Sequence, residues 1–235
     1  MMSYHIIHFD EIDSTNNYLK NSYKLLDNFT FVTTDYQSSG KGRNDRVWTS
    51  KKGENLMFSL LIKDTSLLKK YSALSIISAA EVAILLESYG IKNVSIKWPN
   101  DVYVNDKKIC GILLEGQILE YLVIGVGLNV NQKGFPDGLR RPATSCILET
   151  GEKLNIDELK QKLFDAIYKD FTKLDTDHFL EYFKAHNYLI NKRVKTVISG
   201  ETFIGEVIGI DYNFNLQVHV NDMLLHIDSG EIEIL

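Results

Sequence analysis

The sequence predicts an α+β fold that ends in a small all-β unit. Residues 67–89 carry apolar side chains at helical spacing and are followed by Gly90, a residue that commonly ends helices. Residues 94–131 contain several short β-favouring runs separated by turn residues, which indicates hairpins rather than alternating strands and helices. Residues 193–235 contain only short strand-like runs, at the spacing of a small barrel.

Length and composition are those of a globular protein with one main core. The chain has 235 residues, of which 44% are hydrophobic, and we expect a catalytic domain over residues 1–190 and a small domain over residues 191–235. No uninterrupted apolar run reaches the ~18 residues that span a bilayer, and the N-terminal residues lack a secretory signal. These features predict a cytoplasmic protein with no membrane partner.

Charge and cysteine usage exclude several other classes. The net charge of -5 argues against a surface built for the phosphate backbone of nucleic acid, so any anion site must be local. Cys110 and Cys146 have no partner at a C-x-x-C spacing and are predicted to be buried free thiols. The six histidines show no H-E-x-x-H or similar spacing, and we assign them no metal-binding role.

The first elements place a glycine-rich loop between two strands. Residues 4–9 are predicted to form a strand, and Ser14 is a predicted N-cap for a helix that continues to Leu25 and Leu26. Strands follow at residues 29–34 and 55–62, with the loop between them.

The later elements alternate between hairpins and helices. Strands are expected at 94–98, 102–104, 108–115 and 121–131, followed by a loop over residues 132–142. Asn155 is a predicted N-cap for a helix, and residues 179–188 are predicted to form another. The first of these helices carries on one face Leu159, Leu163, Ile167 and Phe171.

The loop over residues 37–50 is the strongest candidate for an anion site. Gly40 and Gly42 allow backbone N–H groups to approach a ligand, while Lys41, Arg43 and Arg46 supply positive charge. The spacing is not that of a Walker loop, because no G-K-[ST] follows the glycines. Taken alone, a solvated loop with incidental cations is the better interpretation.

Three further motifs are ambiguous by themselves. Residues 97–101, K-W-P-N-D, place both charge signs around a rigid turn, and an ordinary β-turn explains them equally well. Lys108 precedes a strand with an internal glycine, which often marks the close approach of a ligand, although an edge lysine with a bulge is the simpler alternative. Gly125 and Gly127 clear one face of a strand, but a lone G-x-G is weak evidence.

Together these motifs resemble one family. The signature G-R-G-R-x-x-R-x-W corresponds to residues 40–48, K-W-P-N-D to 97–101, K-x-x-G-I-L-x-E to 108–115, G-x-G-x-N to 125–129 and S-T-N to 14–16. In this combination and order the chain resembles the catalytic part of biotin protein ligases over nearly its whole length. The resemblance implies a central mixed β-sheet flanked by helices, as in class II aminoacyl-tRNA synthetases, with a C-terminal SH3-like β-barrel.

The resemblance also implies an activity. The enzyme would form biotinyl-5′-AMP from biotin and ATP with Mg²⁺, and then transfer biotin to a lysine of a biotin carboxyl carrier protein, such as that of acetyl-CoA carboxylase. The loop would close over the two reactants and keep water from the adenylate. The helix-turn-helix domain of bifunctional members is missing, so we expect no DNA partner. A homodimer is compatible with the resemblance, although no strand can be singled out for it.

Site residues follow from the same resemblance. The predicted biotin-binding residues are Ser14, Thr15, Asn16, Gln37, Gly40, Lys41, Gly111, Ile112, Gly125 and Gly127. The predicted ATP-binding residues are Arg43, Arg46, Trp48, Asn100, Lys108 and Asn129. The predicted catalytic residues are Lys108, which would bridge the carboxylate and the α-phosphate, Asp101, which would orient the amine, and Arg43.

Two departures and two alternatives remain. Lys41 stands where the family usually has arginine, so a point charge replaces a bidentate fork, and Asp45 stands where glycine is frequent, which predicts a stiffer loop. A lipoate ligase shares the fold and the chemistry, but the intact K-W-P-N-D and loop motifs favour biotin. A non-enzymatic binding module, with the C-terminal unit as an interaction domain, is the alternative from another class.

Overall fold

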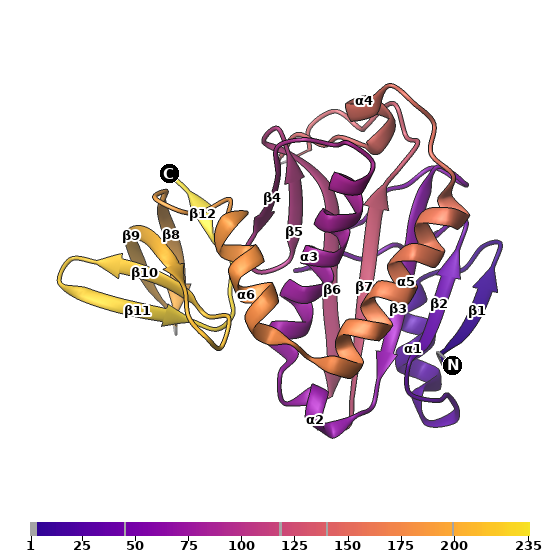
Figure 1. The fold of residues 1–235 in the computed structure, drawn as a ribbon, viewed down its shortest axis with the longest axis horizontal. Helices are drawn as coiled ribbons and strands as arrows, with labels where there is room; N and C mark the ends of the chain where they lie inside the picture. Colours follow the sequence, from indigo (N-terminus) through magenta and orange to yellow (C-terminus); the bar gives the residue numbers. More distant parts are fainter. Residues whose placement is uncertain (1–3, 45, 118, 140, 199) are drawn as a thin grey trace.

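The computed structural model describes residues 4–44, 46–117, 119–139, 141–198 and 200–235. Its main feature is a seven-stranded sheet in the order β1-β2-β3-β7-β6-β5-β4 (Figure 1). The strands are β1 (His5–Phe9), β2 (Thr30–Thr34), β3 (Asn55–Ile62), β4 (Val94–Lys97), β5 (Asp101–Val104), β6 (Lys107–Gln117) and β7 (Tyr121–Asn129). The predicted mixed sheet is therefore confirmed.

Only the first strand pair of this sheet is parallel. β1 runs parallel to β2, and helix α1 (Thr15–Ser22) connects them, as a parallel pair requires a crossover. All other neighbours, from β2 to β4, pair antiparallel, and short turns join β4 to β5, β5 to β6 and β6 to β7. Ser14 caps α1 by accepting a hydrogen bond from the backbone N–H of Asn17, as predicted.

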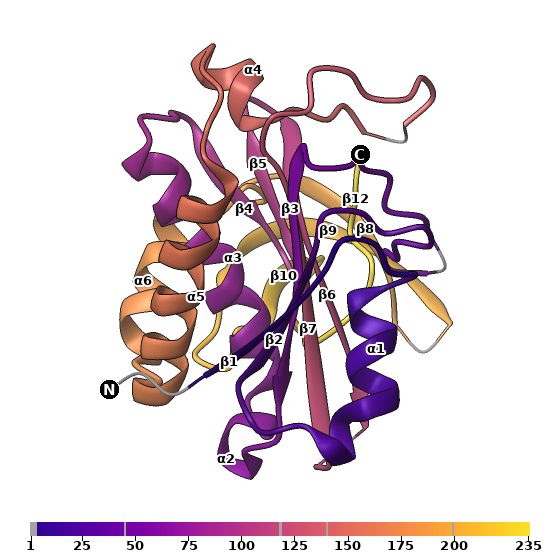
Figure 2. The same ribbon diagram turned by 90° about the vertical axis from the view of Figure 1, so that its right-hand side faces the viewer.

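Helices cover the two faces of the sheet unequally. α3 (Tyr71–Ser88), α5 (Ile156–Lys173) and α6 (Thr176–Ala185) lie on one face, and α1 lies on the other, which leaves much of that second face open (Figure 2). The four apolar residues predicted to share one face of α5 are all buried. Gly111 of β6 and both glycines of β7, Gly125 and Gly127, lie on the open face.

α3 is the central helix of the core. It is the single helix in the described ranges whose length and mean hydropathy of 1.4 would allow a membrane span, although serines and glutamates interrupt its apolar residues. Within the protein, 72% of that window is buried between the sheet and the helices α5 and α6. Its apolar character is thus that of a core helix.

The C-terminal residues form a second, five-stranded sheet in the order β11-β10-β9-β8-β12. Its strands are β8 (Arg193–Ile198), β9 (Glu201–Ile210), β10 (Leu216–Val220), β11 (Met223–Ile227) and β12 (Glu233–Ile234), all paired antiparallel. The indole N–H of Trp98 donates to the carbonyl of Phe214 at 2.9 Å and fastens this sheet to the first. The predicted small β unit is confirmed, whereas the boundary at residue 191 stays a prediction.

Several element boundaries differ from those predicted. The helix predicted over residues 67–89 is two helices, α2 (Thr65–Leu68) and α3, because the chain turns at Lys69 and Lys70. The first helix ends at Ser22, and Leu25 lies in a short 3₁₀ turn, η1 (Tyr23–Leu25), with 90% of its surface exposed. α4 (Cys146–Thr150) was not predicted, and the last helix begins and ends three residues earlier than expected. Both cysteines are buried and free, as predicted.

Candidate active site

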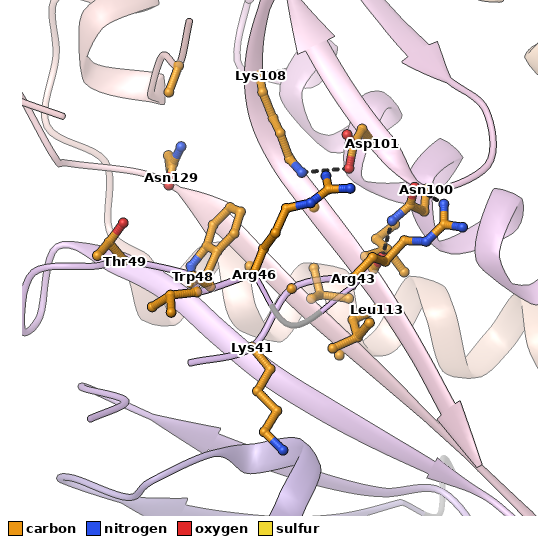
Figure 3. Close-up of a pocket in the computed structure, with 18 of the residues that line it drawn as sticks. Lys41, Arg43, Arg46, Trp48, Thr49, Asn100, Asp101, Lys108, Leu113 and Asn129 are labelled. Carbon is orange, nitrogen blue, oxygen red and sulfur yellow. Dashed lines mark hydrogen bonds and ion pairs between the residues drawn. The ribbon is translucent and has the colours of Figure 1, made fainter. Parts of the chain in front are cut away.

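A cavity of about 280 Å³ lies between the loop after residue 40 and the open face of the sheet (Figure 3). The predicted residues that line it are Ser14, Thr15, Asn16, Gln37, Lys41, Arg43, Arg46, Trp48, Asn100, Asp101, Lys108, Gly111, Ile112, Gly125, Gly127 and Asn129. Gly40 does not line the cavity. Its backbone pairs with Trp48, and a Cβ there would meet the Trp48 carbonyl at 2.5 Å. Gly40 therefore closes the base of the loop.

Two glycines form the part of the cavity floor that receives Trp48. Gly111 of β6 and Gly127 of β7 are register partners, and both lie under the indole. A Cβ at Gly127 would stand 2.6 Å from the ring carbon Cε2 of Trp48, and one at Gly111 would stand 3.2 Å from Cζ3. The ring fits only because neither residue has a side chain. Within the described residues, the buried indole Nε1 has no hydrogen-bond partner, so a donor remains for a ligand.

Lys108 and Asp101 form the charged centre of the site. The Lys108 Nζ lies 2.6 Å from the Asp101 Oδ1 and 5.6 Å from the centre of the Trp48 ring. Asp101 stands at the start of β5 and Lys108 near the start of β6, so the β5–β6 hairpin brings them together. The ammonium therefore has an anionic partner until an anionic ligand competes for it.

Arg43 joins the loop to the K-W-P-N-D turn. Its Nη1 donates to the Oδ1 of Asn100 at 3.2 Å, and the Nδ2 of Asn100 donates to the Ile112 carbonyl at 2.6 Å. Burial lowers the pKa of Arg43, although the charges of Asp101 and Glu231 oppose that shift. Arg43 remains a cation at neutral pH, and it is fixed in orientation by these contacts.

The C-terminal unit contributes residues to the cavity, and the sequence motifs did not predict this contribution. Arg43 Nη2 donates to the Gly230 carbonyl at 2.8 Å, and Arg46 Nη2 lies 2.6 Å from Glu231 Oε1. Glu231 and Ile232 line the cavity. No local pattern marks these two residues, because their role depends on how the second sheet docks.

The opposite end of the cavity is lined by the neutral polar side chains of residues 14–16 and 37. The backbone N–H of Thr15 donates to Gln37 Oε1 at 2.9 Å, and the Thr15 hydroxyl lies 2.7 Å from the hydroxyl of Ser59. Ser14, Thr15 and Asn16 are nearly inaccessible to solvent, with exposed fractions of 1%, 3% and 4%. A neutral ligand group with both donors and acceptors suits this end better than a charged one.

Lys41 is the predicted site residue whose side chain departs most from the rest. Figure 3 shows it pointing away from Lys108 and Arg46. Its charge acts instead on Asp13. A hydrogen bond from Asn17 lowers the pKa of the Asp13 carboxyl, partial burial opposes this shift, and the positive charge of Lys41 adds to it. The substitution of lysine for arginine thus falls outside the charged centre. Asp45, the other departure, lies outside the described residues.

The loop over residues 132–142 forms one wall of the cavity. The cavity-lining residues from this segment and its C-terminal flank are Phe135, Leu139, Arg141 and Ala143. Asn129 fixes this wall, because its Nδ2 donates to the Thr144 carbonyl at 3.0 Å. The sequence predicts only a connecting loop here, and nothing in its composition indicates a cavity wall.

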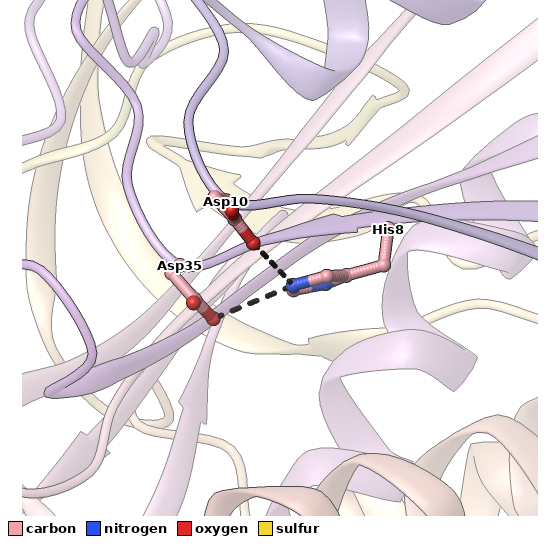
Figure 4. A group of neighbouring side chains, drawn as sticks. All are labelled: His8, Asp10 and Asp35. Carbon is pink, nitrogen blue, oxygen red and sulfur yellow. Dashed lines mark ion pairs between the residues drawn. The ribbon is translucent and has the colours of Figure 1, made fainter.

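A separate group of potential metal ligands lies at the ends of β1 and β2 (Figure 4). His8 Nε2 lies 3.9 Å from Asp10 Oδ1 and 3.8 Å from Asp35 Oδ1. Spacing along the chain did not reveal this group, because Asp35 joins it from a neighbouring strand. None of the three lines the cavity, and the Asp10 side chain is 91% exposed.

Comparisons with known proteins agree on one family. A model of the biotin/lipoate A/B protein ligase family matches residues 8–129. The bifunctional ligase/repressor BirA of Bacillus subtilis is 32% identical over 247 aligned positions, which cover 100% of this chain and 75% of that protein. The biotin–[acetyl-CoA-carboxylase] ligase of Paracoccus denitrificans is 31% identical over 71% of this chain and 73% of that protein.

A solved structure extends the likeness to the whole fold. The biotin protein ligase of Aquifex aeolicus, in complex with biotin and ATP, superposes with a TM-score of 0.85 at 27% identity, covering 98% of each chain. The family match, the relatives and this superposition include both the loop and the sheet that form the cavity. The chain belongs to the biotin/lipoate A/B protein ligase family.

Proposed function

We propose that this protein joins the carboxylate of biotin to the α-phosphate of ATP, releases diphosphate, and passes biotin from biotinyl-5′-AMP to a lysine of a biotin carboxyl carrier protein. The observation that carries the proposal is the polarity of one cavity. Its charged end holds Lys108 and Arg43, and its neutral polar end holds Thr15 and Gln37. Biotin has the same two ends, a carboxylate and a neutral ureido ring.

The charged end suits the first half-reaction. A carboxylate and a polyphosphate repel each other, so the reaction needs positive charge and fixed positions. Lys108 would contact both reacting groups, and Arg43, oriented by Asn100, would hold a phosphate. The buried Trp48 Nε1 supplies a further donor at the same end.

The Lys108–Asp101 pair suits the second half-reaction. Once Lys108 turns to the anionic reactants, Asp101 gains the freedom to accept a hydrogen bond from the amine of the carrier lysine. The carboxylate would orient that amine toward the mixed anhydride and assist its deprotonation.

The donor set of the cavity is compatible with Mg²⁺. Carboxylate oxygens and phosphates are the ligands that Mg²⁺ favours. Among the described residues, Asp101 and Glu231 are the carboxylates that line the cavity, and either can supply an oxygen beside the ATP phosphates. When bound, Mg²⁺ would neutralise phosphate charge.

The deciding experiment weighs the acceptor. The protein is incubated with MgATP, biotin and a purified carrier domain, and mass spectrometry measures the carrier. We expect the mass of one biotinyl group to be added, with none added when lipoate replaces biotin. Lipoylation without biotinylation would identify a lipoate ligase, and an unmodified carrier together with no biotin-dependent ATP/diphosphate exchange would contradict the proposal.

A further inference from the structure

A hydrogen-bonded chain of side chains runs beneath the neutral end of the cavity. It begins on α1, crosses to β6 and returns through α1 and β3 to the cavity wall. Its members are, in order, Lys20, Glu115, Asn16, Ser59, Thr15 and Gln37. Glu115 ends the K-x-x-G-I-L-x-E motif, and nothing in the proposed reaction uses it.

Glu115 determines which way the Asn16 amide points. The carboxylate accepts a hydrogen bond from Lys20 on Oε1, and on Oε2 it accepts one from Asn16 Nδ2 at 2.8 Å. Burial opposes ionisation of Glu115, but the hydrogen bonds from Lys20 and Asn16 outweigh it and hold the pKa of this carboxyl below its ordinary value. Because an ionised carboxylate can only accept, the NH₂ of Asn16 must face it.

The amide oxygen of Asn16 therefore faces the other way. It lies over Gly125, where a Cβ would stand 2.3 Å from Oδ1, and it accepts a hydrogen bond from the Ser59 hydroxyl. Ser59 is fully buried, so its single hydrogen is committed to Asn16. Its oxygen is left to accept from Thr15.

Through Thr15, this fixed order of donors and acceptors extends to the cavity. The Thr15 Oγ1 lies 2.7 Å from Ser59 Oγ and 3.1 Å from Gln37 Oε1, and either of these oxygens can accept its one hydrogen. A hydroxyl has one hydrogen, so the Thr15 oxygen presents only lone pairs to a ligand. Gln37 Oε1 also accepts from the Thr15 backbone. The Gln37 nitrogen donates to the Met57 sulphur at 3.7 Å and, with two N–H groups, keeps a second donor for a ligand.

We propose that Glu115 is a positioning residue that fixes the donor and acceptor polarity of the neutral end of the cavity, and that it thereby sets affinity for a ligand group carrying an N–H beside a C=O. Glu115 does not line this cavity. It lies on the wall of a neighbouring cavity of about 520 Å³ and acts through Asn16. The inference rests on the proposed function, in which that ligand group is the ureido ring of biotin.

A swap of two nearly isosteric residues tests the polarity directly. Glu115→Gln can donate or accept, so the Asn16 amide is free to reverse, and biotin binding measured by calorimetry should weaken about 10-fold, the loss of one hydrogen bond. Asn16→Asp alone places two carboxylates together and should also weaken binding. The double variant Glu115→Gln/Asn16→Asp returns an acceptor-only group to the centre of the chain, and biotin affinity should recover to within about 3-fold of the wild type.

Controls separate positioning from stability. The ATP affinity and the melting temperature of Glu115→Gln should match those of the wild type, and Glu120→Gln, an exposed residue of the β6–β7 turn, should bind biotin normally. Should Glu115→Gln not fold, Ser59→Ala interrupts the same chain and should weaken biotin binding about 10-fold.

Three outcomes would overturn the inference alone: wild-type affinity in Glu115→Gln, wild-type affinity in Ser59→Ala, or a double variant no better than the single ones. A wild-type protein that does not bind biotin would overturn the proposed function together with this inference.

Discussion

At the scale of single residues, the proposed reaction requires groups that have one partner in this structure to take another when the reactants bind. The Lys108 ammonium is paired with Asp101 at 2.6 Å, and both side chains are largely shielded, with exposed fractions of 29% and 18%. A charge in such surroundings interacts more strongly with a ligand than a fully solvated one does. Lys108 is therefore the residue whose loss should most affect chemistry.

Replacement of Lys108 by methionine keeps the length of the side chain and removes its charge. We expect adenylate formation to fall by about 10²- to 10³-fold, as for the loss of one preorganised donor. Biotin-dependent exchange of diphosphate into ATP measures this step. Lys107→Met, at the adjacent exposed position, is the matched control and should retain activity. Wild-type exchange by Lys108→Met would refute the role.

Gly125 offers a steric test of the neutral end. An alanine Cβ would stand 2.3 Å from Asn16 Oδ1, so the buried amide would have to move. Gly125→Ala should weaken biotin binding at least about 10-fold and leave ATP binding unchanged. Gly134→Ala, where a Cβ meets nothing within 4 Å, should bind both ligands normally. Equal biotin affinities of the two variants would show that Asn16 does not need this space.

The sequence motifs anticipated most of these residues, for a physical reason. Some of them act through local features, namely a missing side chain in a strand (Gly111 and Gly127) or a charge at a turn (Lys108 and Asp101). A short sequence motif is enough to predict such features. Glu231 acts only because a distant sheet docks on the loop, and the Lys41 side chain points away from the charged centre toward groups that are distant in the sequence. No short sequence pattern predicts the role of Glu231 or the direction of the Lys41 side chain.

At the scale of elements, the loop and the C-terminal unit form a single cover over the cavity. Arg43 and Arg46 on the loop hold Gly230 and Glu231, which precede β12. The Arg46–Glu231 pair is about half exposed, so its contribution should be modest, about 0.5 kcal/mol. The position of the loop therefore depends on several weak contacts.

Glu231→Gln should loosen the loop without unfolding the protein. We expect faster amide hydrogen exchange in residues 41–49 in the absence of ligand, and slower exchange in both proteins once biotin and ATP are bound. Glu233→Gln, two residues further along, should exchange as the wild type does. Identical loop exchange in Glu231→Gln and the wild type would show that this contact does not hold the loop.

Element boundaries were less predictable than element types. The apolar pattern over residues 67–89 is continuous, but the chain turns at Lys69 and Lys70 and starts a new helix there. The spacing of apolar residues predicts which side chains face the core. It does not reveal that the helix axis changes direction between two helices whose apolar faces point to the same core. The break matters because Tyr71 and Ser75, in the first turns of α3, line the second cavity.

At the scale of the whole molecule, the hydrophobic pattern was enough to predict the α+β class and the small C-terminal β unit, whereas the mixed sheet followed from the family resemblance. Burial has one cost in this arrangement. Glu81 of α3 is 94% buried against α5, as its exposed fraction is 6%. Burial raises its pKa to about 8, helped by the hydrogen bond that the protonated Glu81 donates to Asp170 and by the negative charge of Asp170, against a smaller effect of Lys169.

This raised pKa predicts how stability depends on pH. The unfolded chain releases the proton near pH 4.3 and the folded one near pH 8, so the folded state binds more protons between these values and loses stability as pH rises. Glu81→Gln should remove this loss and stabilise the protein at pH 8 by on the order of 1–3 kcal/mol, with little effect near pH 4.5. Melting temperatures of Glu81→Gln, the wild type and the exposed control Glu152→Gln at both pH values would check it. A constant difference across pH would contradict the prediction.

The fit of Trp48 onto two glycines gives the protein an optical signal of its own. The chain has two tryptophans, and Trp98 is 2% exposed with its indole bonded to Phe214 beneath the second sheet. Trp98 also lines the cavity but is held by that bond, whereas Trp48 has an unpaired indole N–H among the described residues and Lys108 5.6 Å from its ring centre. A ligand that moves the indole or draws Lys108 away would change its intrinsic fluorescence. Occupation of the site can therefore be followed in the unlabelled protein through its own tryptophans.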